Sequence, residues 1–434
     1  MVLFPPQHVE PGHAIIVSHV GAVGDSCESS VIAVTTELPP GFLTLPADGD
    51  RSVAQLERKL SLLVLETLLT VRAPGLPLAR LAAFLTQIAR STHKNALLAA
   101  LANADVRTPL LALRSGLVRP EVALADAVPA LLAALGKAED SFLWDAPVSR
   151  LFDARRHRVT RFDPPAQGLL LNASGAELRS ADGRLLDVSQ LDAEPELFPL
   201  ASGPLFALAD DNPLSMMEEH PEKSGNAIDL GGRPRQEWTE TLDDALGVIA
   251  TALPALSSEL CESVQRFVPV GYHAERHLSA SYREAPGIVY LTLHPSLLTM
   301  AEAIVHESQH GKLNVLRWFD PVLQNGDSAW SASPVRPDLR PLWGVLLAVH
   351  AFVPVAALHL VLAEQDHPLS RGEPFARRRA EVLSANEHGL STLRKLGEPT
   401  PVGKKVLTGL EEIHAAVSAQ APSRQSDATV SALG

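Results

Sequence analysis

Two hydrophobic periods alternate along the chain and divide its first half into three regions. Residues 1–52 contain short apolar runs, AIIVSHV and SVIAVTT, between Pro and Gly, and this pattern predicts a β-rich N-terminal arm. From 53 to 145, leucines and alanines recur three and four positions apart, which predicts a helical bundle. Residues 146–210 return to short apolar runs between turn signals such as ASG and ADG, so we expect a second β-rich segment there.

The second half of the chain has mainly helical periodicity. A polar stretch rich in Pro and Gly, 211–236, predicts a linker or long loop, and the region 237–419 follows as a predicted metal-binding catalytic domain. Its clearest strand signal is PGIVYLTLH, residues 286–294. Long helical patterns cover 296–318, 341–365 and about 375–397. The small, polar tail 420–434 is expected to be disordered. The predicted class is α+β, mostly α-helical, with a zincin-like strand-then-helix core in the C-terminal half.

Composition favours a cytoplasmic globular protein that binds neither nucleic acid nor a membrane. The net charge of −13 argues against polyanionic partners. Cys27 and Cys261 are far apart and form no CxxC pair, and the N-terminus shows no secretory signal, so a reducing compartment is expected. The apolar run 342–362 approaches membrane-spanning length, but its two histidines and central Pro354 favour a buried core helix.

The chemistry of the chain is indicated by HESQH, residues 306–310, which lies inside a helical pattern. Residues four apart share one face of a helix, so His306 and His310 can direct both imidazoles to one metal ion. Glu307 lies one position round the helix, near the same ion. A strand signal directly before the motif helix is typical of zincin sites, and it favours metal binding over a chance match.

A zinc peptidase is one interpretation of this motif. Such an enzyme uses the motif glutamate, Glu307, as general base and needs a third protein ligand. The extension HExxHxxGxxH is missing, because Leu313 and Leu316 occupy the positions of its Gly and last His. The gluzincin alternative takes a downstream glutamate from an NExx(S/A) context. The segment NEHGL, residues 386–390, would supply Glu387 but matches only in part, because its last residue is not small.

Other candidates for a third ligand lie in the helical pattern 341–365. His350 and Glu364 are fourteen residues apart, about 21 Å along one helix, so at most one reaches the ion unless Pro354 breaks the helix. His350 has apolar neighbours, LLAVHAFV, among which an imidazole needs a partner. We therefore favour His350 as the ligand, and expect His359 to be structural or exposed.

A Pro-rich loop with two arginines leads directly into that helix. Arg336 and Arg340 lie in SPVRPDLRP, residues 333–341. A guanidinium beside a metal suits bidentate capture of a carboxylate. The alternative is a surface loop whose arginines pair with acidic neighbours such as Asp338, and spacing alone does not separate the two interpretations.

These motifs, in this order, resemble a known family. HESQH, then SPVRPDLRP, then GVLLAVHAF at 344–352 is similar to the HExxH-motif peptide-modification proteins. These are regarded as 2-oxoglutarate-dependent peptide β-hydroxylases and occur beside gene clusters for ribosomally made peptides. The resemblance covers about 240–400, including SASYREAPGIVYLTLH at 279–294. Val335 departs from the commoner form, which has Trp, so substrate positioning near this loop is expected to differ.

The resemblance implies Fe(II), 2-oxoglutarate and O₂ as cofactors, with Zn(II) left to the peptidase alternative. It implies His306 and His310 as iron ligands, with a third protein ligand that we assign to His350. One arginine, Arg340 or Arg336, would hold the far carboxylate of 2-oxoglutarate.

The resemblance also implies an oxidoreductase of natural product biosynthesis that hydroxylates the β-carbon of a residue in a peptide or of a carrier-bound amino acid. Glu307 would then orient a water or a histidine, and would not act as a hydrolytic base. Substrate recognition and homodimer formation are the roles considered for residues 53–143. A helical interaction protein with a fortuitous HExxH is the non-enzymatic interpretation.

Overall fold

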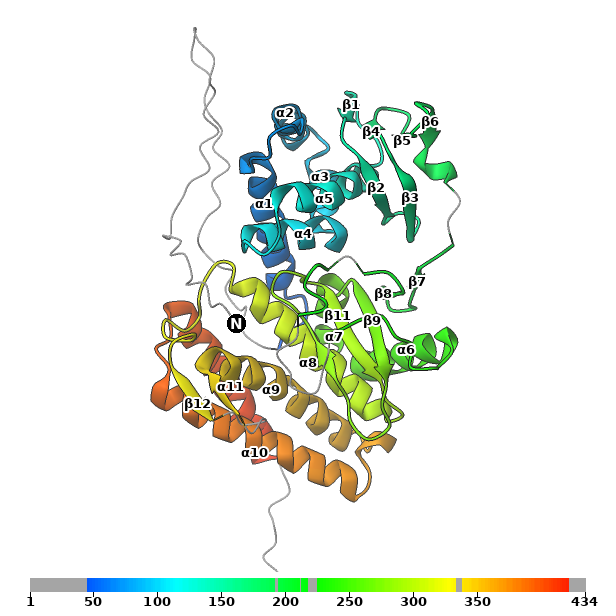
Figure 1. The fold of residues 1–434 in the computed structure, drawn as a ribbon. Helices are drawn as coiled ribbons and strands as arrows, with labels where there is room; N and C mark the ends of the chain where they lie inside the picture. Colours follow the sequence, from blue (N-terminus) through cyan, green and yellow to red (C-terminus); the bar gives the residue numbers. More distant parts are fainter. Residues whose placement is uncertain (1–44, 192–193, 211, 218–224, 333–337, 421–434) are drawn as a thin grey trace, which may run out of the picture. The chain divides into compact units, whose positions relative to one another are not determined.

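The structure, a computed structural model, describes residues 45–191, 194–210, 212–217, 225–332 and 338–420 (Figure 1). About 52% of the described residues are helical and 17% lie in strands, which confirms the predicted α+β class and the predominance of helix. The chain forms two compact units, and each is described by itself. The predicted arm at 1–52 and tail at 420–434 lie mostly outside the described residues, as does part of the predicted linker at 211–236.

Among the described residues, the first unit comprises those of 54–195 together with 212–213. Its helices are α1 (Ser52–Thr70), α2 (Leu78–Arg90), α3 (Lys94–Ala102), α4 (Ala104–Arg114) and α5 (Pro120–Leu135). The strands β1 (Phe142–Trp144), β4 (Gly168–Leu171), β5 (Ala176–Arg179) and β6 (Leu185–Asp187) form an antiparallel sheet, and β2 (Val148–Asp153) pairs with β3 (Arg158–Ala166). The hydrophobic pattern predicts separate regions at 53–145 and 146–210. In the structure helix α5 packs on β2 and β4, so bundle and strands share one core.

The second unit is built on a five-stranded mixed sheet of order β10-β11-β9-β8-β7. The strands are β7 (Leu197–Pro199), β8 (Leu205–Ala207), β9 (Arg266–Tyr272), β10 (Ser279–Ala280) and β11 (Ile288–Leu293). β9 runs parallel to both β8 and β11. The end of the predicted segment 146–210 therefore belongs to this unit and not to the first. In that unit β8 pairs with β9, about sixty residues further along the chain, and no local sequence signal predicts this pairing.

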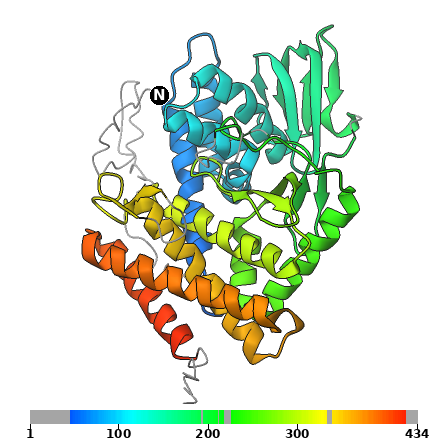
Figure 2. The same cartoon turned by 60° about the horizontal axis from the view of Figure 1, so that its bottom comes forward.

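Helices cover this sheet and complete the second unit (Figure 1, Figure 2). They are α6 (Arg235–Ala252), α7 (Pro254–Ser263), α8 (Leu297–Leu316), α9 (Leu342–Glu364), α10 (Glu373–Leu396) and α11 (Pro401–Ala419). A short hairpin, β12 (Trp330–Ala332) and β13 (Leu339–Pro341), precedes α9. The helices predicted at 296–318, 341–365 and about 375–397 are thus confirmed as α8, α9 and α10, and the strand predicted at 286–294 is β11.

The core of the second unit places the motif helix. All six residues of β11 are buried, and Val289, Leu291 and Leu293 share a hydrophobic cluster with α6, α8 and α9. Ser296 caps α8, because its hydroxyl accepts from the amide of Thr299 at 3.3 Å. The motif helix therefore begins directly after a fully buried strand, and α9 packs between it and α10.

Helix α9 is long and apolar enough to cross a membrane, but 78% of its apolar window is buried inside the structure. It is therefore a core helix, as its histidines and Pro354 predict. The helix continues through Pro354 to Glu364. The break that would let both His350 and Glu364 reach one ion is absent from this fully described helix.

A glycine in α11 provides a test of the packing in this unit. A Cβ atom at Gly403 would lie 1.9 Å from the carbonyl oxygen of Val322. We expect Gly403→Ala to lower the free energy of unfolding by about 1–3 kcal/mol, as overpacking does. The control is Gly247→Ala in α6, where nothing lies within 4 Å. It should raise stability by about 0.5–1 kcal/mol through helix propensity. Urea denaturation of both variants checks this, and equal effects would contradict the packing.

Candidate metal centre

His306 and His310 lie side by side on α8, as their spacing predicts. Their ring centroids are 4.2 Å apart and their planes are inclined by 58°. Together with Glu307 they form a group whose candidate ligand atoms all lie within 4.8 Å of one another. Nδ1 of His306 and Nε2 of His310 are buried and have no hydrogen-bond partner among the described residues. Unpaired buried nitrogens are costly, and a metal ion would satisfy both, so these residues fit a metal.

The protonation of His306 also fits a metal ligand. Burial, reinforced by the neighbouring His310, lowers the pKa of His306 to about 3. The imidazole is therefore neutral near pH 7 and offers a lone pair, which is the form that binds metal ions.

Glu307 is held behind His310 by two serines. Ser279 Oγ donates to Glu307 Oε1 at 2.6 Å, and Ser281 Oγ donates to Oε2 at 2.7 Å. Glu307 Oε2 also lies 3.5 Å from Nδ1 of His310. A histidine whose Nδ1 faces a carboxylate presents its Nε2 to a metal, and here Nε2 is the unpaired buried atom. The contacts make Glu307 an orienting partner of His310.

Glu307 carries a negative charge at neutral pH. Burial alone would raise the pKa of this carboxyl group, but the adjacent His310 and His306 and the Ser279 hydroxyl together outweigh burial and lower it. A carboxylate with a lowered pKa and both oxygens engaged holds a proton poorly.

Ser279 lies in β10, the edge strand next to β11, and Ser281 follows directly after that strand. β10 pairs antiparallel with β11, and it contacts α8. Alternate residues of an extended segment face the same side, so Ser279 and Ser281 both turn toward Glu307. Neither serine is predicted from the sequence to be part of the site. The available signal was the S-A-S alternation in front of the motif strand.

The structure does not bring His350 into the cluster of His306, Glu307 and His310. His350 is fully buried in α9, the helix that packs on α8. Its assignment as third ligand stays a prediction. Glu364 is exposed at the end of α9.

The gluzincin candidate lies in a different environment. The side chain of Glu387 is 65% exposed, and its Oε2 lies 3.2 Å from Nε2 of His414. Its neighbour Asn386 is buried and donates to the carbonyl oxygen of Phe352 at 3.0 Å. Asn386 in the partial NExx match therefore joins α10 to α9.

The structure describes the position of Arg340, whereas Arg336 lies outside the described residues. Arg340 lies in β13, opposite Ser331, with its Nε 3.0 Å from Asp338 Oδ2. This is the pairing with an acidic neighbour that was the alternative to carboxylate capture. Arg336 lies in the stretch 333–337, outside the described residues. The role of both arginines in holding 2-oxoglutarate stays a prediction.

A buried ionic network lies one turn before His306, and sequence reasoning missed it. Glu302 Oε1 lies 2.7 Å from Nε2 of His359, and its Oε2 accepts from Nε of Arg378 at 2.8 Å. Burial favours the neutral form of Glu302, but His359 and Arg378 outweigh it, so the pKa of Glu302 is lowered. His359 is fully buried in this pair, in keeping with a structural histidine.

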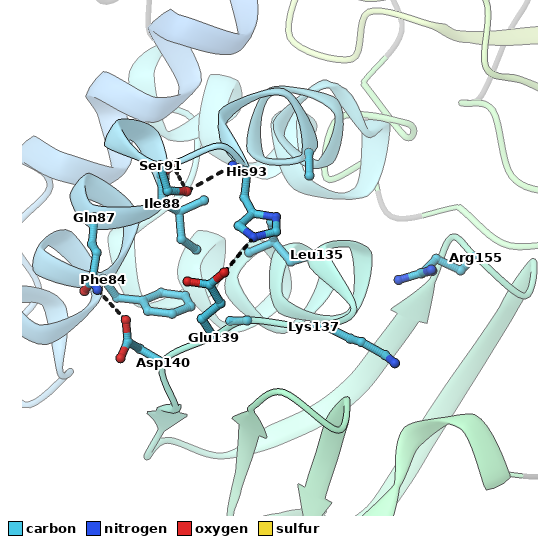
Figure 3. Close-up of a pocket in the computed structure, with 12 residues that line it drawn as sticks. Phe84, Gln87, Ile88, Ser91, His93, Leu135, Lys137, Glu139, Asp140 and Arg155 are labelled. Carbon is cyan, nitrogen blue, oxygen red and sulfur yellow. Dashed lines mark hydrogen bonds and ion pairs between the residues drawn. The ribbon is translucent and has the colours of Figure 1, made fainter.

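The first unit contains a separate pocket of about 280 Å³ (Figure 3). Its apolar lining includes Phe84, Ile88 and Leu135. At its rim Gln87 hydrogen-bonds Asp140, and His93 Nε2 lies 3.4 Å from Glu139 Oε1. Within the described part of the chain, the one group of metal-ligand atoms is that of α8, so this pocket is not the metal centre.

A scan against protein-family models and a search of curated proteins match nothing to this chain. The resemblance of the three motifs to peptide β-hydroxylases therefore stays a proposal.

Proposed function

We propose that this protein is a cytoplasmic Fe(II)- and 2-oxoglutarate-dependent oxygenase that hydroxylates the β-carbon of a residue in a peptide or of a carrier-bound amino acid. One observation carries the proposal. His306 and His310 present buried nitrogens without a partner in the described chain, while Glu307 is tied to two serines behind them. This arrangement provides metal ligands without a free general base. A zincin-like strand-then-helix core is part of the proposal.

The position of Glu307 weighs against the peptidase alternative. Hydrolysis at a zinc site needs the motif glutamate to take a proton from the attacking water. Glu307 accepts hydrogen bonds on both oxygens, and its pKa is lowered. Such a carboxylate is a weak base toward water. An oxygenase has no need of that base, so the same contacts suit it.

The residues of the chain have distinct tasks in the proposed reaction. His306 and His310 would hold the iron, with His350 as third ligand and Glu307 fixing the ring of His310. When bound, iron and 2-oxoglutarate supply the oxidation of an unactivated C–H bond by O₂. The protein binds and orients the substrate, and its buried surroundings exclude water.

Carboxylate capture by the arginine loop is tested by Arg340→Ala. Loss of hydrogen bonds to a charged partner is worth about 1.5–3 kcal/mol, so the apparent KM for 2-oxoglutarate should rise about tenfold to a hundredfold. Arg336→Ala belongs in the same series, and one of the two variants should show the effect. Arg371→Ala is the control, because Arg371 is exposed and pairs with Asp366. An unchanged KM in both the Arg340→Ala and the Arg336→Ala variant would remove these arginines from the site.

The reaction class is tested on peptides encoded beside the gene. We expect a mass gain of one oxygen atom in the peptide, dependent on Fe(II), 2-oxoglutarate and O₂. A peptidase would instead yield two fragments, with Zn(II) and without 2-oxoglutarate. Mass spectrometry of the reaction mixture distinguishes the two outcomes.

A further inference from the structure

We propose that Glu302 is a positioning residue of the metal centre, which acts on His306 through Arg378 and Phe352. The inference rests on the proposed function only in requiring that His306 binds a metal ion. It concerns a residue outside the HExxH motif, and it predicts an effect on metal binding itself.

Glu302 lies on the same face of α8 as His306, one turn earlier. It is 6% exposed, so its carboxylate is almost removed from water. A buried charge persists only when it is paired and hydrogen-bonded, and both oxygens of Glu302 are engaged by partners from other helices. His359 of α9 contacts Oε1, and Arg378 of α10 contacts Oε2. The carboxylate thus joins the motif helix to both neighbouring helices.

Arg378 is fixed in direction by this carboxylate. Its Nε donates to Glu302 Oε2, and a second guanidinium nitrogen lies 2.8 Å from the same oxygen. A planar guanidinium held on one edge cannot turn freely. Its Cζ lies 5.7 Å from the ring centroid of Phe352, within the range of a cation–π contact.

The ring of Phe352 packs against the ring of His306 and so restrains its orientation. The two ring centroids are 4.6 Å apart, with the planes inclined by 61° in an edge-to-face contact. The backbone of Phe352 is fixed as well, since its carbonyl oxygen accepts from Asn386 of α10. Two residues of α10, Arg378 and Asn386, therefore hold Phe352 in place against His306.

The chain of contacts runs without a gap from Glu302 through Arg378 and Phe352 to the imidazole. A metal ligand must present its nitrogen in one direction, and partners behind a ligand typically set affinity by tenfold to a hundredfold. For His310 the partner is Glu307. For His306 the contacts assign that task to the edge of Phe352, with Glu302 as its distant support.

The test is titration of the metal-free protein with Co(II), without 2-oxoglutarate, followed by visible absorption. We expect Glu302→Gln and Phe352→Leu each to weaken Co(II) binding about tenfold to a hundredfold and to change the Co(II) spectrum. Arg378→Lys keeps the charge but loses the planar fork, so a smaller loss is expected. Arg377→Gln, at the exposed neighbouring arginine, is the matched control and should bind Co(II) like the wild type.

A double variant tests the route of the effect. If Glu302 acts through Phe352, Glu302→Gln should add little in a Phe352→Leu background, because residues in one chain of contacts are not additive. Full additivity would overturn the route and with it the proposal. Should Glu302→Gln fail to fold, the double variant Phe352→Leu/Arg378→Lys is compared with its two single variants, and full additivity there would overturn the route in the same way.

The remaining outcomes are also decisive. Variants that lose melting temperature but bind Co(II) like the wild type would show that the network only supports the fold, and would overturn the inference alone. The inference alone would also be overturned if Glu302→Gln, Phe352→Leu and Arg378→Lys all bind Co(II) like the wild type while Arg378→Lys changes the KM for 2-oxoglutarate. A wild-type protein that binds no Co(II) would overturn both this inference and the proposed function.

Discussion

Replacing either motif histidine is expected to abolish metal-dependent stabilisation of the protein. Wild type should melt at a higher temperature with excess Fe(II) or Co(II), because a ligand that binds only the folded state stabilises it by about 2.7 kcal/mol at a hundredfold excess over Kd. His306→Ala and His310→Ala should show no such rise. Structural zinc sites bind with roughly 10–16 kcal/mol through four ligands, so one lost ligand costs about a hundredfold or more in affinity.

Melting curves with and without metal, recorded under anaerobic conditions, provide the measurement. His388→Ala is the control, since His388 is exposed on α10 and belongs to no cluster of ligand atoms among the described residues. His306→Ala should in addition cost little stability in the metal-free protein. The substitution removes a buried nitrogen without a described partner. Persistent stabilisation by metal in both motif variants would place the metal elsewhere.

The third ligand gives the second large effect, and it separates the two enzyme classes. In the proposed oxygenase His350→Ala should lower turnover at least about a hundredfold, since an iron site with two protein ligands binds its metal weakly. Glu387→Ala should leave turnover within about twofold of wild type. The side chain of Glu387 is largely exposed and lies against His414, so only a surface contact is lost.

A gluzincin-type peptidase predicts the reverse pattern. Activity should be measured at saturating metal, and again after metal removal and reloading, so that weak binding is separated from loss of fold. His350→Gln is measured as a second variant. Its side chain fills more of the buried site than Ala does, so it removes the imidazole and leaves a smaller cavity. If both Ala variants keep full activity, neither assignment of the third ligand survives.

The sequence was sufficient where the signal is local and periodic. Apolar spacing placed α8, α9 and α10 within a few residues of their ends, and the β-branched run placed β11. The pairing of His306 with His310 followed from helical geometry alone. These features depend on residues a few positions apart, which is the range that pattern reasoning covers.

The contacts that define the surroundings of the site are not local. Glu302 and Arg378 are 76 positions apart, and Ser281 and Glu307 are 26 apart. No periodic signal connects such residues, because their meeting depends on how α8 packs on α10 and how β10 pairs with β11. For the same reason no local signal predicts that β7 and β8 belong to the second unit, since β8 pairs in parallel with the distant β9.

Asn386 and Glu307 were interpreted from sequence motifs, but the structure shows contacts that the motifs do not predict. Asn386 belongs to the partial NExx match, yet it donates to the backbone of α9. Glu307 belongs to HExxH, yet its oxygens accept from Ser279 of the edge strand β10 and from Ser281 just after it. A motif records residue types, whereas the role of a carboxylate depends on which donors surround it.

The central claim is that the HExxH histidines serve oxidation and not hydrolysis. It is tested most directly by loading the metal-free protein with Fe(II) under anaerobic conditions, adding 2-oxoglutarate, and measuring succinate after admission of O₂. The peptides encoded beside the gene are included as candidate substrates. We predict succinate formation that depends on Fe(II) and O₂ and is lost in His306→Ala. The absence of succinate, together with peptide cleavage by the Zn(II)-loaded protein, would contradict the account.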